Sequence, residues 1–127
     1  MISGLGIDLV ELERIKVLLK RKPRFPQRIL TEEERSIYHA LSEQRQVEFL
    51  AGRFVAKEAL AKALGTGVGG RFSWQDVSIL KEENGAPRLV WHKRPSAIGR
   101  DDVIHLSLSH SHRYALAQVV VEKRPSS

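Results

Sequence analysis

Glu58 and Lys62 stand one helical turn apart in an otherwise apolar segment, FLAGRFVAKEALAKALG, which runs from Phe49 to Gly65. Residues four apart share one face of a helix, so Phe54 lies in the same row as this pair. A carboxylate and an ammonium within an apolar stripe are costly unless they are paired or put to use. From this segment alone, the simpler explanation is a Glu–Lys pair on a solvated face, because such pairs are common on helices.

Asp8 supplies a second isolated carboxylate, on the same face of its segment as Gly4 and Gly6. Two carboxylates are too few for a calcium site built from protein alone, but they suit Mg²⁺, which keeps several waters and is completed by substrate phosphates. With Lys62 to hold a phosphate beside the metal, they form a minimal set for phosphoryl transfer. The alternative is that Asp8 caps the following helix, although Glu11 lies nearer its start.

The histidines and Ser109 are weaker candidates for chemistry. Ser109 followed by His110 allows a hydrolase hypothesis, but adjacent residues at a strand end point apart and no G-x-S-x-G turn surrounds them. His105 alternates with apolar residues, which is typical of a structural histidine. The five histidines show no metal-ligand spacing and the chain has no cysteine, which argues against a zinc site.

The net charge of +6 is concentrated in one segment, residues 14–28, which has seven lysines and arginines and no acidic residue. An acidic protein, an anionic membrane or a nucleic acid would each fit such a segment. A non-enzymatic nucleic-acid-binding module is therefore the main alternative to an enzyme. Aromatic residues make up only 6% of the chain, so a base-stacking platform is less attractive.

Helices predominate among the elements expected in the first half of the chain. Thr31 and Glu34 form a capping box at a helix start, and a glycine closes the apolar helix described above. In order we expect a strand over residues 2–10, a helix over 11–20 ended by Pro23 and Pro26, a short helix from Thr31 to about Leu41, and a long helix over 43–64 closed by Gly65.

The second half is predicted to consist of strands, over residues 77–82, 88–92, 103–109 and 114–121. Asn84-Gly85 marks a hairpin between the first two, and residues 109–113 connect the last two. The chain length favours one domain over residues 1–122, with residues 123–127 as a flexible tail.

Composition narrows the class of protein further. Hydrophobic content of 42% and charged content of 28% are ordinary for a soluble globular domain. We find no apolar run long enough to span a membrane. The N-terminus has no basic region and carries Asp8 where a signal peptide would be apolar, so we expect a cytoplasmic protein.

Three blocks of the sequence resemble those of a known family. GLGIDLVELERI at residues 4–15 resembles a G-x-D block, FLAGRFVAKEALAKALGTG at 49–67 an R-[FW]-x-x-K-E-A-x-x-K-A helix, and HLSLSHSHRYALAQVVVE at 105–122 a closing S-x-S-H strand pair. Together they are similar to the small holo-[acyl-carrier-protein] synthases, a group within the 4'-phosphopantetheinyl transferase family. Their order and spacing agree over nearly the whole chain, with no departure at a motif position.

The resemblance implies a reaction in support of fatty acid biosynthesis. The 4'-phosphopantetheine of coenzyme A would move to a serine hydroxyl of an apo acyl carrier protein, releasing adenosine 3',5'-bisphosphate. Asp8 and Glu58 would hold Mg²⁺ together with the pyrophosphate, and Lys62 would neutralise phosphate charge or protonate the leaving group. The serine proton would leave through Glu58 or a metal-bound water.

The resemblance also implies where coenzyme A binds. The matching residues are Arg53, Asn84 and His105 at the adenosine and 3'-phosphate end, Lys62, Gly65 and Thr66 along the pyrophosphate and pantetheine path, and Ser109 and His110, whose role is less defined.

The architecture implied is α+β, with a long central helix packed on an antiparallel sheet. Small members of the family form homotrimers whose active sites lie between subunits. One subunit would supply Asp8, Glu58 and Lys62, and its neighbour would supply Asn84 and His105. No nucleic acid or membrane is a partner under this interpretation.

The basic segment also fits the resemblance, because carrier proteins are acidic and helical. A positive surface would attract them and raise the association rate. We expect Lys16, Lys22 and Arg28 to be a solvated face, and the docking residues to be Arg14, Lys20, Arg21 and Arg24.

Overall fold

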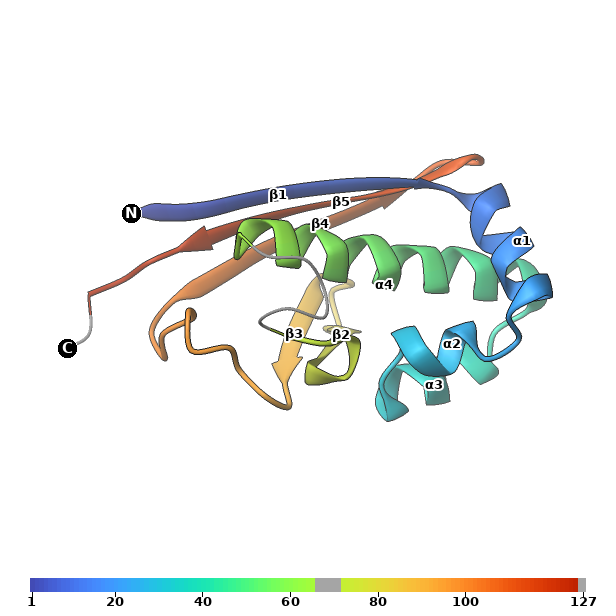
Figure 1. Ribbon diagram of the computed structural model, residues 1–127, viewed down its shortest axis with the longest axis horizontal. Coiled ribbons are helices and arrows are strands. Elements are labelled where there is room, and N and C mark those ends of the chain that lie inside the picture. The colour runs from blue at the N-terminus through green and yellow to red at the C-terminus, as the bar shows by residue number, and fades with distance from the viewer. Residues whose placement is uncertain (66–71, 126–127) are drawn as a thin grey trace.

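The computed structural model describes residues 1–65 and 72–125 as one α+β arrangement (Figure 1). The elements are β1 (Ile2–Glu11), α1 (Leu12–Arg21), α2 (Phe25–Ile29), α3 (Glu32–His39), α4 (Glu43–Ala63), a 3₁₀ turn η1 (Trp74–Asp76), β2 (Val77–Lys81), β3 (Pro87–Trp91), β4 (Val103–His110) and β5 (Tyr114–Glu122). The long helix and the strands expected from the sequence are confirmed, with ends that differ by at most one residue.

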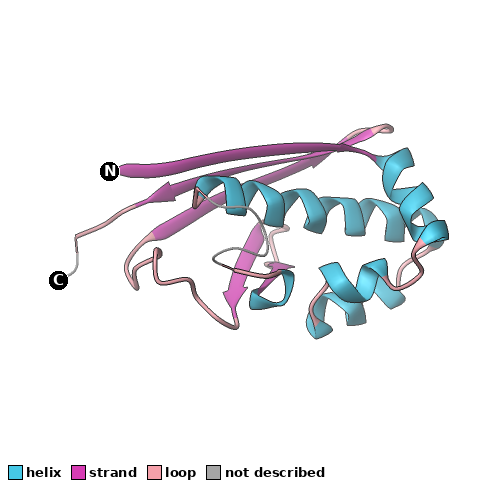
Figure 2. Cartoon of the chain, viewed as in Figure 1, coloured by secondary structure: helices cyan, strands magenta, loops and turns pink. Residues whose placement is uncertain are grey.

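A three-stranded antiparallel sheet, in the order β1-β5-β4, lies against one side of α4. The short helices α2 and α3 and the separate β2–β3 hairpin lie on the other side of α4, as the colouring by element type shows (Figure 2). Asp8 pairs with Ala117 across β1 and β5, and His105 pairs with Val120 across β4 and β5. The long helix is therefore the central layer of the molecule.

The two glycines of β1 let α4 approach the strand closely. A Cβ atom at Gly4 would lie 2.0 Å from the carbonyl oxygen of Ala63, and one at Gly6 would lie 1.9 Å from that of Ala59. Real Cβ atoms do not come so near, so only glycine fits at either position. The space that the sequence leaves on the Asp8 face is thus filled by the backbone of α4.

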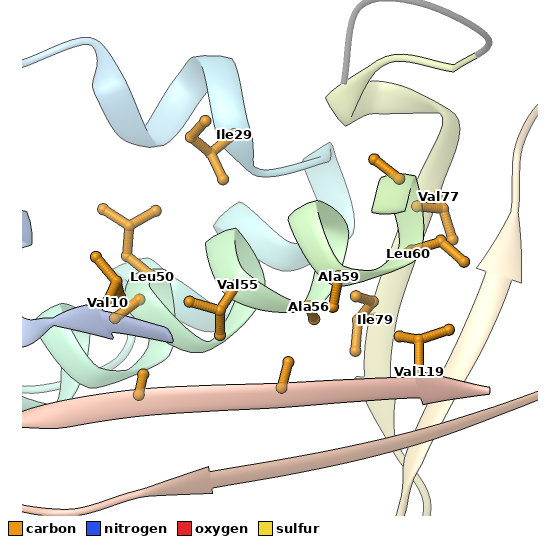
Figure 3. Close-up of a cluster of buried hydrophobic side chains, with 14 of the residues drawn as sticks. Val10, Ile29, Leu50, Val55, Ala56, Ala59, Leu60, Val77, Ile79 and Val119 are labelled. Carbon is orange, nitrogen blue, oxygen red and sulfur yellow. The ribbon is translucent and has the colours of Figure 1, made fainter. Parts of the chain in front are cut away.

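The core lies between α4 and the sheet and continues towards the β2–β3 hairpin (Figure 3). Leu50 and Val55 of α4 are fully buried, as are Val119 of β5 and Ile79 of β2. Small residues of α4, such as Ala59, allow close packing against the strands. Because α4 has protein on both sides, it is apolar almost all round.

The segment after α1 differs from the sequence expectation, because it contains an unpredicted helix. α1 ends before Pro23, as expected, but α2 then begins at Phe25 with Pro26 in its first turn. Proline is tolerated there because the first N–H groups of a helix have no intrahelical partner. The capping box at Thr31 is confirmed, and α3 ends at His39, two residues short of the expected limit.

The two predicted turn glycines adopt the backbone conformation that favours glycine. Gly65, with φ of +77°, follows the end of α4, and Gly85, with φ of +86°, lies in the β2–β3 turn. The hairpin is longer than a two-residue turn, since Lys81 pairs with Pro87. The turn η1 was not predicted.

The start of the expected tail makes contacts. Lys123 forms an ion pair of 2.7 Å with Asp102, and its backbone N–H donates to the carbonyl oxygen of Met1 at 2.8 Å. Residues 126–127 lie outside the described residues. Within the described ranges, no helix has both the length and the hydropathy that a bilayer crossing requires.

Candidate active site

Asp8 and Lys62 meet where β1 runs beside the last turns of α4. The Lys62 ammonium donates to Asp8 Oδ1 at 3.0 Å and to the carbonyl oxygen of Ile7 at 3.0 Å. The side chain of Asp8 is 19% exposed and that of Lys62 54% exposed, so the pair faces solvent on one side. The ion pair of Lys62 is therefore with Asp8 on the strand, and not the Glu58–Lys62 pair along the helix that was the alternative explanation.

Glu58 lies one helical turn before Lys62 on the same face of α4. Burial raises the pKa of Glu58 above its usual 4.5, the negative charge of Asp8 raises it further, and Lys62 opposes both effects. The repulsion means that two carboxylates share one site with a single ammonium. Such a site has unused capacity for positive charge.

The donor set of this site fits Mg²⁺. Asp8 and Glu58 offer hard carboxylate oxygens, and a cation between them would relieve the repulsion that raises the pKa of Glu58. Within residues 1–65 and 72–125, no cluster of three or more metal-ligating side chains occurs. Mg²⁺ commonly binds to only one or two carboxylates and takes its other ligands from water and phosphate.

A separate cavity of about 590 Å³ lies between α3, α4, the β2–β3 hairpin and the end of β4. Its lining is rich in cationic side chains, namely Arg45, Arg53, Lys81 and Arg88, and it includes Ser109 and His110. Asp8, Glu58 and Lys62 lie outside this lining. Positive side chains around a cavity favour an anionic ligand, and guanidinium groups are well suited to phosphates.

Arg53 is held rigidly at the wall of this cavity. Its Nε–H donates to the carbonyl oxygen of Ile79 at 3.1 Å, and its guanidinium carbon lies 4.0 Å from the centre of the Phe49 ring. Burial lowers the pKa of Arg53 to about 10, with Glu34 opposing the shift, so the group stays charged at neutral pH. A fixed cation of this kind costs little reorganisation when an anion binds.

The other residues expected to contact coenzyme A are scattered within one chain. Asn84 is exposed in the hairpin turn, and its Oδ1 accepts from the N–H of Ala86 at 2.9 Å. His105 lies 2.9 Å from Glu122, and this hydrogen bond is the main cause of the lowered pKa of Glu122. Gly65 follows α4, whereas Thr66 lies outside the described residues.

A buried ion pair that the sequence did not reveal lies inside the molecule. The fully buried ammonium of Lys57 donates to Glu34 at 2.7 Å and to the carbonyl oxygens of Ile29 and Trp74 at 2.9 Å. Glu34 also accepts from the N–H of Ile79 at 2.7 Å. The sequence did contain one sign of this pair. Lys57 lies in a helix that is apolar almost all round, and a lysine buried in such a helix requires an acidic partner.

The residues expected to dock a carrier protein lie on the surface of α1 and the turn after it. Leu12 and Ile15 of α1 are buried, which directs the rest of this short helix outwards. The basic side chains Arg14, Lys20, Arg21 and Arg24 are all exposed.

Comparison with known proteins identifies the family to which these features belong. Residues 4–119 match the sequence model of the 4'-phosphopantetheinyl transferase superfamily. This chain belongs to that superfamily. The family expected from the three sequence blocks is therefore confirmed, and the match covers the Asp8 cluster as well as β4 and most of β5.

Members of the superfamily resemble the chain over its whole length. A holo-[acyl-carrier-protein] synthase of Bacillus pumilus is 51% identical over 126 residues, which is 99% of this chain and 100% of that protein. A Bacillus anthracis holo-(acyl-carrier-protein) synthase, solved in complex with CoA (3',5'-ADP), has a TM-score of 0.85 and 44% identity over 98% of this chain and 99% of that chain. A Helicobacter pylori relative solved with coenzyme A has a TM-score of 0.75 and 31% identity, covering 93% and 99%.

Proposed function

We propose that this chain transfers 4'-phosphopantetheine from coenzyme A to a serine of an apo acyl carrier protein, giving the holo carrier protein and adenosine 3',5'-bisphosphate. The observation that carries the proposal is the Asp8–Lys62 contact beside Glu58, in a chain of this superfamily. Its relatives are named as holo-[acyl-carrier-protein] synthases, and two solved relatives hold coenzyme A.

The reaction makes one bond to phosphorus and breaks another. The serine oxygen of the carrier protein bonds to the phosphorus that bears the pantetheine arm. The bond from that phosphorus to the bridging oxygen of the pyrophosphate breaks, and adenosine 3',5'-bisphosphate leaves. Transfer of this kind depends mainly on positioning and on neutralising charge, which the cluster on β1 and α4 is equipped to do.

Each residue of the cluster has a distinct part in this scheme. Asp8 and Glu58 would hold Mg²⁺, which when bound neutralises phosphate charge at the reacting centre. Lys62, more than half exposed, can turn its ammonium from Asp8 to the leaving phosphate. The serine proton would pass to the carboxylate of Glu58 or to a water held beside it.

The cationic cavity is the proposed site for the nucleotide end of coenzyme A. Arg53, with Arg45 and Arg88 nearby, supplies the positive charge that the 3'-phosphate requires. Ser109 and His110 lie in the same lining, and Asn84 adjoins Gly85 at its edge. Of the residues expected at the adenosine and 3'-phosphate end, Arg53 supports this placement, whereas Asn84 and His105 lie outside the lining.

The site is proposed to be completed by a second copy of the chain in a homotrimer. The outer face of the sheet exposes Leu5, Ile7 and Leu9 by 56–65%, with Tyr114 and Leu116 beside them at 41% and 37%. An apolar sheet face of this kind requires cover. Within one chain the cavity does not include the Asp8 cluster, so a neighbour's cavity residues are needed.

Leu5→Glu should give monomers by light scattering, because it places a charge in this apolar face, and an intact trimer would contradict this interface.

The reaction can be tested through its nucleotide product. Chromatography should show one adenosine 3',5'-bisphosphate released for each carrier protein modified, when the chain is mixed with coenzyme A, Mg²⁺ and apo carrier protein. A carrier protein whose acceptor serine is replaced by alanine is the matched control and should release none. Release that does not depend on this serine would indicate hydrolysis and would overturn the proposal.

A further inference from the structure

Gly52, in the middle of α4, is a glycine that the rest of the chain does not require. The structure describes six glycines, and a Cβ atom added at Gly52 would meet no atom within 4 Å. Its backbone is helical, without the positive φ that favours glycine. The other five have a reason in the chain itself, either a close approach or a positive φ: Gly4, Gly6, Gly65, Gly85 and Gly99.

Glycine in the interior of a helix is unfavourable, because it loses more backbone freedom on folding than alanine does. Alanine at this position would meet no neighbour and would therefore stabilise α4. The open space beside Gly52 is thus maintained at a cost in stability. A use for that space has to lie outside this chain, in a molecule that binds there.

The position of Gly52 indicates which molecule this is. Gly52 lines the cationic cavity of about 590 Å³ together with Phe49 and Arg53, whose guanidinium carbon lies 4.0 Å from the centre of the Phe49 ring. Gly85 and Pro87 of the hairpin form part of the same lining. A bare helix surface beside an aromatic ring accepts a flat group, and the surrounding cations accept phosphate. A purine nucleotide with a phosphorylated ribose has both.

We propose that Gly52 is a specificity-determining residue, whose missing side chain leaves room for the adenosine 3',5'-bisphosphate end of coenzyme A. The assignment rests on the proposed function, since that function supplies the nucleotide. It goes further by giving the helix surface itself, and not only the charged side chains, a part in recognition. A side chain at residue 52 would occupy the place of the nucleotide without touching the Asp8 cluster.

The test compares Gly52→Ala and Gly52→Leu with the unchanged chain. Calorimetry measures the dissociation constant of adenosine 3',5'-bisphosphate, and steady-state kinetics measures the KM of coenzyme A. We expect Gly52→Ala to raise the melting temperature by about 3–5 °C. It should also raise the dissociation constant of the nucleotide and the KM of coenzyme A about 3- to 10-fold. Gly52→Leu should raise them at least about 30-fold, while the KM of the carrier protein stays unchanged. Gln44→Leu places the same leucine side chain at an exposed position of α4 outside the cavity and should change neither constant.

The outcomes separate this assignment from the function on which it rests. A folded Gly52→Ala or Gly52→Leu chain that binds the nucleotide as tightly as the unchanged chain would overturn the assignment and leave the function standing. A Gly52→Leu chain that becomes monomeric but keeps its nucleotide affinity would show that a second copy of the chain occupies the space beside Gly52. That result would also overturn the assignment. An unchanged chain that binds no nucleotide and modifies no carrier protein would overturn the proposed function itself.

Discussion

The charged form of Glu58, which the proposed function requires, lowers the stability of the folded protein. The pKa of Glu58 is raised in the folded protein. Its contribution to folding stability is therefore most favourable where the group is protonated in both the folded and the unfolded state, below about pH 4.5. That contribution is lost as the pH rises through the folded-state pKa, because the folded protein then has to hold a disfavoured charge. At neutral pH the protein therefore carries an electrostatic cost at this residue, which a bound cation would remove.

Glu58→Gln is expected to separate these two effects. Turnover should fall at least about 100-fold, because a metal ligand and proton acceptor is lost. In EDTA at pH 7 the variant should melt at a higher temperature than the unchanged chain, and this gain should disappear below about pH 4.5. Calorimetric melting across the pH range checks the sign of this effect.

Asp8→Asn should also abolish turnover, and Glu43→Gln, on the exposed first turn of α4, is the matched control. Near-normal turnover in either site variant would remove the metal assignment.

Removal of one partner from the buried Lys57–Glu34 pair is expected to destabilise the fold strongly, because the other charge stays buried without compensation. Lys57→Met leaves Glu34 buried without its cation and should lower the free energy of unfolding by about 3–5 kcal/mol. Urea denaturation measures the loss. The double variant Lys57→Met/Glu34→Gln removes both charges and should recover part of it. A single variant less than about 1 kcal/mol below the unchanged chain would show that Glu34 does not need its cation in the folded protein.

At the scale of the elements, local signals in the sequence predicted more than long-range ones. The capping box at Thr31 and the glycine after α4 are read from neighbouring residues, and both are confirmed. α2 was missed because Pro26 was taken only as a helix breaker, although it occupies the first turn. The partner of Lys57 was missed because it lies 23 residues away, where no helical spacing connects the two.

In the candidate site, too, the local spacing was predicted from the sequence and the long-range contacts were not. The spacing of Glu58 and Lys62 drew attention to the correct face of α4, but the ion pair of Lys62 is with Asp8 on a strand 54 residues earlier. The cationic cavity joins residues of α3, α4 and four strands, so Arg45, Lys81 and Arg88 could not be grouped from spacing alone. Both sites depend on how the helix is placed between its two layers.

Contact between β1 and α4 brings Asp8 beside Lys62, and Gly6 makes that contact possible. Gly6→Ala would place a Cβ atom 1.9 Å from the carbonyl oxygen of Ala59, a backbone atom that cannot turn aside. α4 would have to move away from the sheet, so we expect a loss of at least about 2 kcal/mol in unfolding free energy. Urea denaturation measures it, and Gly52→Ala is the matched control without a clash. A Gly6→Ala chain as stable as the unchanged one would show that the close approach is not required.

At the scale of the whole molecule, charge is distributed to suit an acidic partner. The exposed basic residues of α1 and the following turn lie on an element that continues directly from β1, the strand that carries Asp8. A partner held there would be steered by long-range attraction, which acts on the association rate and weakens as salt rises.

Reversing two of these charges should affect one substrate more than the other. Arg14→Glu combined with Arg21→Glu should raise the KM of the carrier protein at least about 10-fold and leave that of coenzyme A nearly unchanged. The double variant Lys16→Glu/Arg28→Glu reverses the same amount of charge in the same segment, at residues expected to be a solvated face, and should have the smaller effect. Equal changes in both KM values would show that this surface does not dock the carrier protein.

Intact-mass spectrometry of an apo acyl carrier protein, incubated with this chain, coenzyme A and Mg²⁺, tests the central claim most directly. The account predicts a mass gain of one phosphopantetheine arm, and no gain when EDTA is present. If the folded chain modifies none of several carrier proteins, the transferase account is contradicted, and the basic segment would instead favour a nucleic-acid-binding module.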